Sequence, residues 1–488
     1  MIINHRQMIQ IEKNSGMSSS EIMNIAGRKL SSFLEETFPE MKNVLILAGN
    51  GNNGGDGLVA AGILSQKAHV SVYLINGKPK TEESLEAMNR LPSSMFIREH
   101  QVKECADEAD VIVDGVFGFS YHGRLSEDLS EIFRSVNHYS QKIVSIDINS
   151  GCECDSGFCD KNAIVSKYTC ALQYRKPFHA LRKEHHMFEQ CVTLDLGLPQ
   201  TEDSTYLTMN EDVFFSHFPR KKESDYKGSN GKTLLIGGSY GMAGALAMNI
   251  TGARTLGTSY LEVGLSDSIY PIVASSFFSA VFHPFSSSNQ EEVLLPIIRN
   301  AKAIGYGSGC TNLKNKTEVM DMVLLNANCP VVLDAEALRQ LVNNTYLLRF
   351  VHVPLILTPH IGEFAALLNR PKEYVQDHRE ECAVSFSKQF HVYVVLKGAN
   401  TIVVSPDGRK YINESGCQAL AQAGSGDLLT GMTASLLTCK KDIFTAVCMA
   451  VWLHGYLSEY GLKYHSIQNF PLECYPSLMD ELFRKHGY

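Results

Sequence analysis

Two glycine-rich segments, with carboxylates close to them, are the parts of this sequence best suited to chemistry. The first segment reads Gly-Asn-Gly-Asn-Asn-Gly-Gly-Asp-Gly over residues 49–57, after an apolar run and before a helical pattern. Glycines at such a turn allow a ligand to approach the backbone, and the free N–H groups at a helix start attract phosphate oxygens. Because the spacing differs from G-x-G-x-x-G, a tight structural turn is the alternative to phosphate binding.

Two aspartates follow later apolar runs in the same half of the chain. Asp114 begins Asp-Gly-Val-Phe-Gly-Phe-Ser, and Asp147 begins Asp-Ile-Asn-Ser-Gly, with Lys167 and Tyr168 further on. In an open parallel sheet the carboxyl ends of the strands line one crevice, so these acids are expected to converge on the glycine turn. For each aspartate taken singly, a helix cap or a turn position is the competing interpretation.

The second glycine-rich segment is Ala-Gly-Ser-Gly-Asp-Leu-Leu-Thr-Gly over residues 423–431, and its apolar residues continue as a helix. Consecutive N–H groups at a helix start can stabilise a transferring phosphoryl group, and Asp427 can accept the proton of an attacking hydroxyl. A helix N-cap is the alternative role of Asp427. Residues 237–245, also small and placed after a strand pattern, suit either a substrate contact or a tight packing turn.

These segments sit in two series of short apolar runs that alternate with helical patterns. Such alternation predicts parallel sheets covered by helices. The first series of expected strands covers residues 44–48, 70–75, 111–113, 143–146 and 192–196. The second covers residues 233–236, 260–263, 303–304, 331–333, 355–357, 392–396 and 401–404. Helical spacing at residues 7–12 and 20–35, with a serine cap at residues 18–20, predicts a helical lead-in.

The connection between the two series is polar and contains proline. It comprises residues 199–204 and the basic run 220–222, and the boundary is expected near Met209. The sequence therefore predicts an α/β protein of two domains, residues 1–208 and 209–488, each with a mostly parallel sheet.

Composition narrows the class of protein. The apolar share of 44% and the charged share of 20% are typical of globular chains. A net charge of −8 argues against a broad basic surface for nucleic acid and favours small-molecule partners. No secretory signal and no uninterrupted membrane-spanning run is expected from the sequence.

The 13 cysteines are scattered, and many lie in apolar segments. Such thiols are expected to be reduced and structural, which favours a cytoplasmic location. Cys152, Cys154 and Cys159 could be drawn as a metal site, but they lack paired C-x-x-C spacing.

In the first half, N-N-G-G-D-G, D-G-x-F-G-x-x-x-x-G-R and D-I-x-S-G in this order resemble the NAD(P)H-hydrate epimerase family, which has a Rossmann-like fold. The resemblance implies a potassium ion held by Asn53, Asp114 and Ser150. Asp147 is the candidate for acid–base work, since epimerisation needs proton transfers, and a purely binding role is its alternative. The resemblance also implies contacts with the damaged cofactor from Asn52, Asn53, Gly54, Gly55, Asp56, Gly118, Phe119, Ser120, Tyr121, His122, Gly123, Arg124 and Asp147. The chain departs from the family at Asn50 and Asn149, where proline is usual.

In the second half, G-S-G-D, T-P-H-I-G-E-F at 358–364 and L-K-G-A-N-T at 396–401 resemble the NAD(P)H-hydrate dehydratase branch of the ribokinase-like enzymes. The resemblance implies hydrate contacts from Ala245, Gly309, His360 and Asp427, and nucleotide contacts from Lys397, Gly398, Ala399, Asn400, Thr401 and Gly426. Glu363 could organise Mg²⁺ through water, or could cap a helix. The departures are Tyr226, Tyr306, Ser308 and Ile361.

Together the resemblances predict a bifunctional enzyme that epimerises hydrated NADH and NADPH, called NADHX and NADPHX, and dehydrates the S form. ADP is the expected co-substrate, ATP is possible, and a homo-oligomer is expected. The alternative is a ribokinase-like small-molecule kinase fused to a nucleotide-sensing or binding domain. A third hypothesis gives the first domain a sensing or protein-binding role without turnover.

Overall fold

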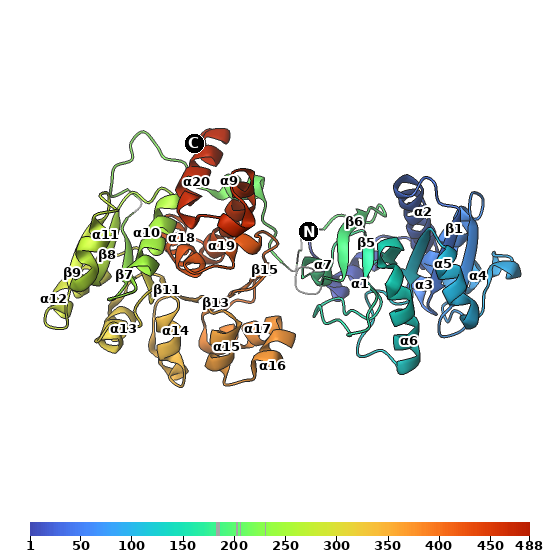
Figure 1. Ribbon diagram of the computed structural model, residues 1–488, viewed down its shortest axis with the longest axis horizontal. Helices are drawn as coiled ribbons and strands as arrows, with labels where there is room; N and C mark the ends of the chain where they lie inside the picture. The colour runs from blue at the N-terminus through green and yellow to red at the C-terminus, as the bar shows by residue number, and fades with distance from the viewer. Residues whose placement is uncertain (182–185, 202–203, 205, 230) are drawn as a thin grey trace. The chain divides into compact units, whose positions relative to one another are not determined.

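The computed structural model describes residues 1–181, 186–201, 204, 206–229 and 231–488. The chain forms two compact units, Met1–Tyr206 and Leu207–Tyr488. Each unit is an α/β layer structure with helices packed on its sheet (Figure 1). Among the described residues, every helix is too short or too polar to cross a membrane.

The first unit contains a six-stranded, wholly parallel sheet in the order β2-β1-β3-β4-β5-β6. Its strands are β1 Asn43–Ala48, β2 His69–Leu74, β3 Val111–Gly115, β4 Ile143–Ile146, β5 Ser166–Leu172 and β6 Phe188–Leu194. Among the described residues, its α-helices are α1 His5–Asn14, α2 Ser19–Thr37, α3 Asn52–Leu64, α4 Glu82–Asn89, α5 Val102–Glu108, α6 Glu127–Val136 and α7 Pro177–Ala180.

Alternation along the central strands explains why helices cover both faces of this sheet. In β1, Val44 and Ile46 join a buried cluster with residues of α2 and α3, whereas Leu45 and Leu47 join a different cluster with residues of α5 and α6. Successive strand residues point to opposite faces, so a strand that is apolar throughout needs cover on both sides.

The lead-in consists of two capped helices. Asn4 caps α1 and Ser18 caps α2, each in a reciprocal capping box. Ser18 is thus the cap among the three serines that the sequence offered, and α1 carries Glu12 toward the sheet edge described below.

The second unit contains a nine-stranded sheet in the order β15-β14-β13-β12-β11-β10-β7-β8-β9. Its strands are β7 Thr233–Gly237, β8 Leu261–Ser266, β9 Val281–Phe285, β10 Ala303–Tyr306, β11 Val331–Leu333, β12 Leu355–Leu357, β13 Tyr393–Leu396, β14 Ile402–Val404 and β15 Lys410–Ile412. The β13–β14 and β14–β15 pairs are antiparallel, and the other pairs of this sheet are parallel.

Helices cover this sheet as well (Figure 1). They are α9 Glu211–His217, α10 Ala243–Thr255, α11 Tyr270–Ala274, α12 Gln290–Asn300, α13 Lys316–Asn326, α14 Glu336–Leu341, α15 Ile361–Leu368, α16 Lys372–Asp377, α17 Arg379–Phe390, α18 Ser425–Cys439, α19 Ile443–Tyr460 and α20 Tyr475–Lys485. Helices α10 and α18 approach unusually closely, because a Cβ on Gly431 would lie 1.8 Å from the Asn249 carbonyl oxygen and one on Gly252 would lie 2.0 Å from that of Leu428.

The predicted α/β class with two mostly parallel sheets is confirmed, but some strands were wrong or missed. The strand predicted at 192–196 is observed as Phe188–Leu194, an edge strand whose residues are mostly half-buried or exposed and which lacks a clear apolar run. Strands β5, β9 and β15 were not predicted, because polar residues or proline interrupt each of them.

Two candidate active sites

In the first unit, the carboxyl ends of four neighbouring strands carry the polar residues. The glycine turn follows β1, Asp114 lies near the end of β3, Asp147 directly follows β4, and Lys176 lies four residues beyond β5. The turn itself is close-packed, since a Cβ on Gly49 would lie 1.9 Å from the Val116 carbonyl oxygen. The expected convergence at one sheet edge is therefore present.

The three expected potassium ligands gather around the backbone of Phe117. The Asn53 amide nitrogen donates to the Phe117 carbonyl at 2.8 Å, and the Ser150 hydroxyl accepts from the Phe117 N–H at 2.9 Å. Ser150 also donates its hydroxyl to Asp114 Oδ1, and its N–H donates to Asp114 Oδ2 at 2.9 Å. Burial raises the pKa of Asp114, and these hydrogen bonds oppose the rise. Oxygen atoms of this kind suit a hard monovalent cation.

Asp147 forms an ion pair with Lys176 in the interior of the unit. One carboxylate oxygen, Oδ1, accepts from Lys176 Nζ and from the Leu172 N–H at 3.0 Å. The other, Oδ2, is buried without a hydrogen-bond partner among the described residues. Asp147 also has a positive φ of 58°, which is uncommon for a residue with a side chain. A paired charge with one open oxygen and a constrained backbone is typical of a functional carboxylate.

The charges of Asp147 and Lys176, together with burial, shift the pKa values of neighbouring titratable groups. Burial and the charge of Asp147 raise the pKa of Glu12 and raise that of Asp56 well above its ordinary range. Burial and the Lys176 charge hold the pKa of His179 well below its ordinary range. Since His179 Nδ1 accepts from the Lys176 N–H at 2.8 Å, its Nε2 carries the proton and donates to the Asp147 carbonyl at 2.7 Å. Burial therefore favours the neutral forms of both neighbouring acids, Glu12 and Asp56.

The segment 118–124 is anchored by its flanks and leaves several side chains exposed. Tyr121 stacks on Phe117 with ring centroids 4.5 Å apart, and the Phe119 carbonyl bonds to His5 Nδ1 at 2.9 Å. The Gly123 N–H donates to Glu153 at 2.9 Å. Arg124 is exposed. These contacts place residues 118–123 beside the carboxyl ends of the strands that carry the acidic residues.

The two departures in this unit differ in effect. Asn149 is fully buried; its amide nitrogen bonds to the Ile164 carbonyl at 3.0 Å and the Met187 carbonyl at 2.8 Å, so it replaces proline's rigidity with hydrogen bonds. Asn50 makes a single weak side-chain bond to the Asn76 carbonyl at 3.5 Å. Loop rigidity is therefore retained at Asn149 rather than lost.

In the second unit, residues after five parallel strands meet at the carboxyl edge of the sheet. Ser239 follows β7, Ser308 and Gly309 follow β10, and Asp334 follows β11. His360 and Lys397 follow β12 and β13 and lie in one parallel bridge. The start of α18 supplies Gly426 and Asp427 to the same edge, because a Cβ on Gly426 would lie 3.2 Å from Lys397 Nζ.

Asp427 lies two residues inside α18, so the helix cap is Gly424 with φ 93° and not Asp427. Burial and the charge of Asp334 raise the pKa of Asp427 to about 6, although Ser308 and Lys397 oppose the rise. The Ser308 hydroxyl is buried and reaches no hydrogen-bond partner of good geometry among the described residues. A carboxylate of this pKa near an open hydroxyl is suited to proton transfer at neutral pH.

A second aspartate, Asp334, connects several side chains of the second unit's site through hydrogen bonds. It is buried and accepts from Lys397 Nζ at 2.8 Å, the Thr358 hydroxyl at 2.8 Å and the Thr430 hydroxyl at 3.0 Å. Burial alone would raise the pKa of Asp334, but the Lys397 charge and these bonds hold it below its ordinary value. The following residue, Ala335, has φ 48° and ψ −113°, a strained conformation fixed beside the site.

His360 caps α15 with its ring. Its Nδ1 accepts from the N–H groups of Gly362 at 3.0 Å and Glu363 at 3.3 Å, while Glu363 accepts from the His360 N–H at 3.0 Å. The side chain of His360 is 58% exposed, and its Nε2 lies 3.5 Å from Glu363 Oε1. Glu363 therefore has the capping role that was its alternative, and Ile361 simply begins the helix.

The remaining predicted contacts fall into two groups. Ala245 and Gly309 lie side by side, since a Cβ on Gly309 would lie 3.1 Å from that of Ala245. The turn after β13 is closed by Thr401, whose hydroxyl donates to the Gly398 carbonyl at 3.1 Å, and Asn400 is buried beneath it. Ala399 is an exposed member of this turn.

Two departures of the second unit have clear surroundings. Tyr306 is buried and donates its hydroxyl to the Lys316 carbonyl at 2.8 Å, so it packs behind the site, whereas Tyr226 is 72% exposed.

Sequence reasoning missed Lys176, Glu12, Asp334 and Thr430. Asp334 carried the same signal as Asp147, an aspartate directly after an apolar strand. Lys176 had no such signal because β5 was not predicted. Neither Glu12 nor Thr430 could be placed before the helices that carry them were packed.

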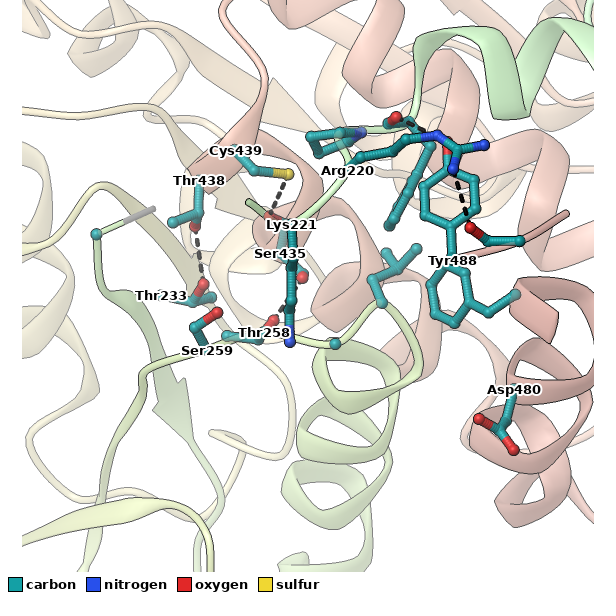
Figure 2. Close-up of a pocket in the computed structure, with 17 residues that line it drawn as sticks. Arg220, Lys221, Thr233, Thr258, Ser259, Ser435, Thr438, Cys439, Asp480 and Tyr488 are labelled. Carbon is teal, nitrogen blue, oxygen red and sulfur yellow. Dashed lines mark hydrogen bonds between the residues drawn. The ribbon is translucent and has the colours of Figure 1, made fainter. Parts of the chain in front are cut away.

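The hollow in Figure 2 lies in the second unit, away from that unit's candidate site. It has a volume of about 330 Å³ and is lined by the start of β7, residues 256–259 after α10, the end of α18, parts of α20 and the residues after it, and residues 218–221. Thr233 and Thr438 join their hydroxyls there at 2.8 Å. Because Thr233 begins β7 and Gly237 ends it, this hollow is at the opposite edge of the sheet from Asp427.

No group of three or more His, Cys, Asp or Glu side chains suited to a metal ion occurs in the part of the chain that is described. Cys152, Cys154 and Cys159 are free thiols.

Fold and sites together define a two-unit α/β enzyme whose second unit is ribokinase-like. A ribokinase-like superfamily protein from Enterococcus faecalis matches 59% of this chain and 99% of its own, with a TM-score of 0.53 and 19% identity. The ADP/ATP-dependent NAD(P)H-hydrate dehydratase of Bacillus subtilis, co-crystallised with ATP and Mg²⁺, covers 57% of this chain and 97% of its own, with a TM-score of 0.51 and 30% identity.

Sequence comparison extends this to the whole chain. Residues 19–178 match the family described as YjeF-related protein N-terminus, and residues 233–474 match NAD(P)H-hydrate dehydratase. The bifunctional NAD(P)H-hydrate repair enzyme of Thermosynechococcus vestitus is 30% identical over 91% of this chain and 88% of its own. The ADP-dependent (S)-NAD(P)H-hydrate dehydratase of Bacillus subtilis is 35% identical over 51% and 87%. The chain belongs to the family of bifunctional NAD(P)H-hydrate repair enzymes.

Proposed function

We propose that the chain repairs hydrated NADH and NADPH by epimerising their R and S hydrates in its first unit and dehydrating the S form at the expense of ADP in its second. The observation that carries this proposal is that Asp427, Lys397 and Gly426 lie together at the start of helix α18. The first unit of the same chain contains a second acidic site, at Asp147. A stereospecific dehydratase consumes one epimer, and the epimerase supplies it from the other.

In the dehydratase, Asp427 accepts the proton of the ring hydroxyl as that oxygen attacks the terminal phosphorus of ADP. AMP leaves, and the phosphate ester formed on the ring is a good leaving group. Its departure with a ring proton restores the reduced nicotinamide. The free N–H groups at the start of α18 stabilise the charge on the transferring group.

Lys397 is placed to hold the nucleotide phosphates. Its ammonium is paired with Asp334, and burial, which alone would lower its pKa, is outweighed by that pair, so the pKa of Lys397 is raised and the positive charge is kept. The turn from Gly398 to Thr401 presents backbone groups beside it. ADP is our choice of co-substrate, with ATP as the alternative.

Mg²⁺ fits this site chiefly through the phosphates of the nucleotide. The described residues offer no ready cluster of ligands, and Mg²⁺ commonly keeps water and phosphate ligands. Glu363, the candidate named from the sequence, has a side chain that is 10% exposed and would act through water. When bound, the ion would neutralise phosphate charge.

In the epimerase, Asp147 is the base whose Oδ2 meets the hydrated ring, and Lys176 positions it. Asp56, whose pKa burial raises well above its ordinary range, can serve as an acid. The glycine turn and residues 118–124 bind the cofactor. Asn53, Asp114 and Ser150 would hold a potassium ion, which would order the loop between them.

Two finer proposals concern the whole protein. We place it in the cytoplasm, where its cofactors are used, and we expect a homo-oligomer. Exposed apolar side chains at residues 270–281, including Phe278 at 89% exposure, favour association between copies. Sedimentation equilibrium would show a monomer if this is wrong.

The alternative, a small-molecule kinase with a sensing domain, would use Asp427 in the same way but would release an intact phosphate ester. Product analysis by ³¹P NMR after incubation with the hydrates and ADP separates the two. Equal amounts of AMP and inorganic phosphate support repair, whereas an accumulating phosphate monoester on the nicotinamide ring supports the kinase.

A further inference from the structure

Two cysteines lie opposite each other in the loop that follows Ser150. Cys152 and Cys159 form an antiparallel bridge. Backbone hydrogen bonds of 2.7 and 2.9 Å flank the pair, each from the residue after one cysteine to the residue before the other. The cysteines therefore occupy a non-hydrogen-bonded position, at which opposing Cα atoms are about 4.5 Å apart.

This position matches the geometry of a disulfide, whose Cα atoms are usually about 4.4–6.8 Å apart. Both sulfurs are free thiols, and the Cys159 sulfur interacts with that of Cys152. Cys152 is fully buried and Cys159 is half-buried, so one member is open to a reagent. The third thiol, Cys154, is buried, and its sulfur interacts with Asp155 instead.

The hairpin closed by these cysteines holds the cofactor loop. Glu153 accepts the Gly123 N–H at 2.9 Å, and Asp160 accepts the Leu125 N–H at 3.3 Å. Cys159 also packs in the same buried cluster as Phe119. A change in the freedom of the hairpin is therefore passed directly to residues 118–125.

We propose that Cys152 and Cys159 are a reversible thiol–disulfide site, oxidised by small disulfides of the glutathione class, that staples the hairpin holding the cofactor loop. The pair needs little backbone movement to close, because the hairpin already has the required register. The disulfide restricts the motion of residues 118–125 without displacing them.

The chemistry is an exchange of sulfur partners. The Cys159 thiolate attacks one sulfur of oxidised glutathione, a mixed disulfide forms, and one glutathione thiolate leaves. The Cys152 thiolate then attacks the Cys159 sulfur and releases the second glutathione; each departing thiolate takes up a proton lost by a cysteine.

The test uses the full chain incubated with oxidised glutathione, alkylated in denaturant and digested with two proteases. Cleavage after Glu153 and before Asp155 puts the three thiols on separate peptides. A Cys152–Cys159 cross-link that disappears on reduction is expected, lost in Cys159→Ser and kept in Cys154→Ser. A lasting glutathione adduct on Cys159, a cross-link to Cys154, or unreacted thiols would overturn the site.

The consequence for the loop is measured by hydrogen exchange. Oxidation should slow exchange of the Gly123 and Leu125 amides several-fold in the wild-type chain and leave it unchanged in Cys159→Ser. Unchanged exchange in a fully cross-linked wild-type protein would overturn the staple. Neither readout depends on epimerase activity, so the result is independent of the proposed function.

Discussion

Replacing Asp427 with asparagine should abolish dehydration and at the same time stabilise the second unit at pH 8. The pKa of Asp427 is raised from 3.8 to about 6 by burial and by the charge of Asp334. A raised carboxyl pKa means that the folded state binds the proton more tightly than the unfolded state, so ionisation costs stability as the pH rises through this interval. A shift of about two units corresponds to about 3 kcal/mol above pH 6.

This magnitude is an upper value, because asparagine must still find hydrogen-bond partners. At pH 5 about half of the cost remains, since the unfolded carboxyl is largely ionised there and Asp427 is mostly protonated. Urea unfolding of wild type and Asp427→Asn at pH 8 and pH 5 should therefore show a gain that shrinks with acidity. Asp321→Asn, on the exposed face of α13, is the control and should change neither stability nor activity.

The same carboxylate sets the acid limb of activity. The kcat/KM of wild-type dehydration should be level above pH 7 and about tenfold lower at pH 5, as an essential base titrates near pH 6. Asp427→Asn should lose about 10²-fold or more in kcat. A variant that is less stable than wild type at pH 8, or that keeps activity within tenfold, would refute the reasoning.

Three further predictions concern other parts of the chain. Lys176→Met leaves Asp147 buried without its partner, so the first unit should lose about 3–5 kcal/mol in denaturant unfolding, and epimerisation should fall while dehydration of pure S hydrate continues. Gly431→Ala places a Cβ 1.8 Å from the Asn249 carbonyl oxygen and should destabilise the second unit by about 3 kcal/mol, whereas Gly244→Ala, with open space around it, should not. Exchange of potassium for choline should slow epimer interconversion alone; equal slowing of dehydration would contradict the assignment of the ion to the first unit.

The sequence was sufficient to predict where some of the candidate residues lie. Asp147 and Asp427 were found because each follows or begins an element at the carboxyl edge of a parallel sheet. Asp334 could have been found by the same rule, because it directly follows β11.

The rest required tertiary structure. Lys176 lies beyond β5, whose alternation of buried and half-buried residues gave no clear strand signal. Glu12 reaches the first site only because α1 packs there, and its raised pKa depends on burial and on Asp147. The close approach of α10 and α18 could not be predicted either. Glycine occurs in helices for many reasons, so Gly252 and Gly431 did not by themselves indicate a close contact.

The most direct test of the account is the recovery of reduced-nicotinamide absorbance from a mixture of both hydrate epimers with ADP, Mg²⁺ and potassium, followed faster than the epimers interconvert unaided. Wild type should recover the whole mixture, Asp147→Asn should stop after the S form, and Asp427→Asn should recover none. Full recovery by Asp147→Asn, or any rapid recovery by Asp427→Asn, would contradict the assignment of the two sites.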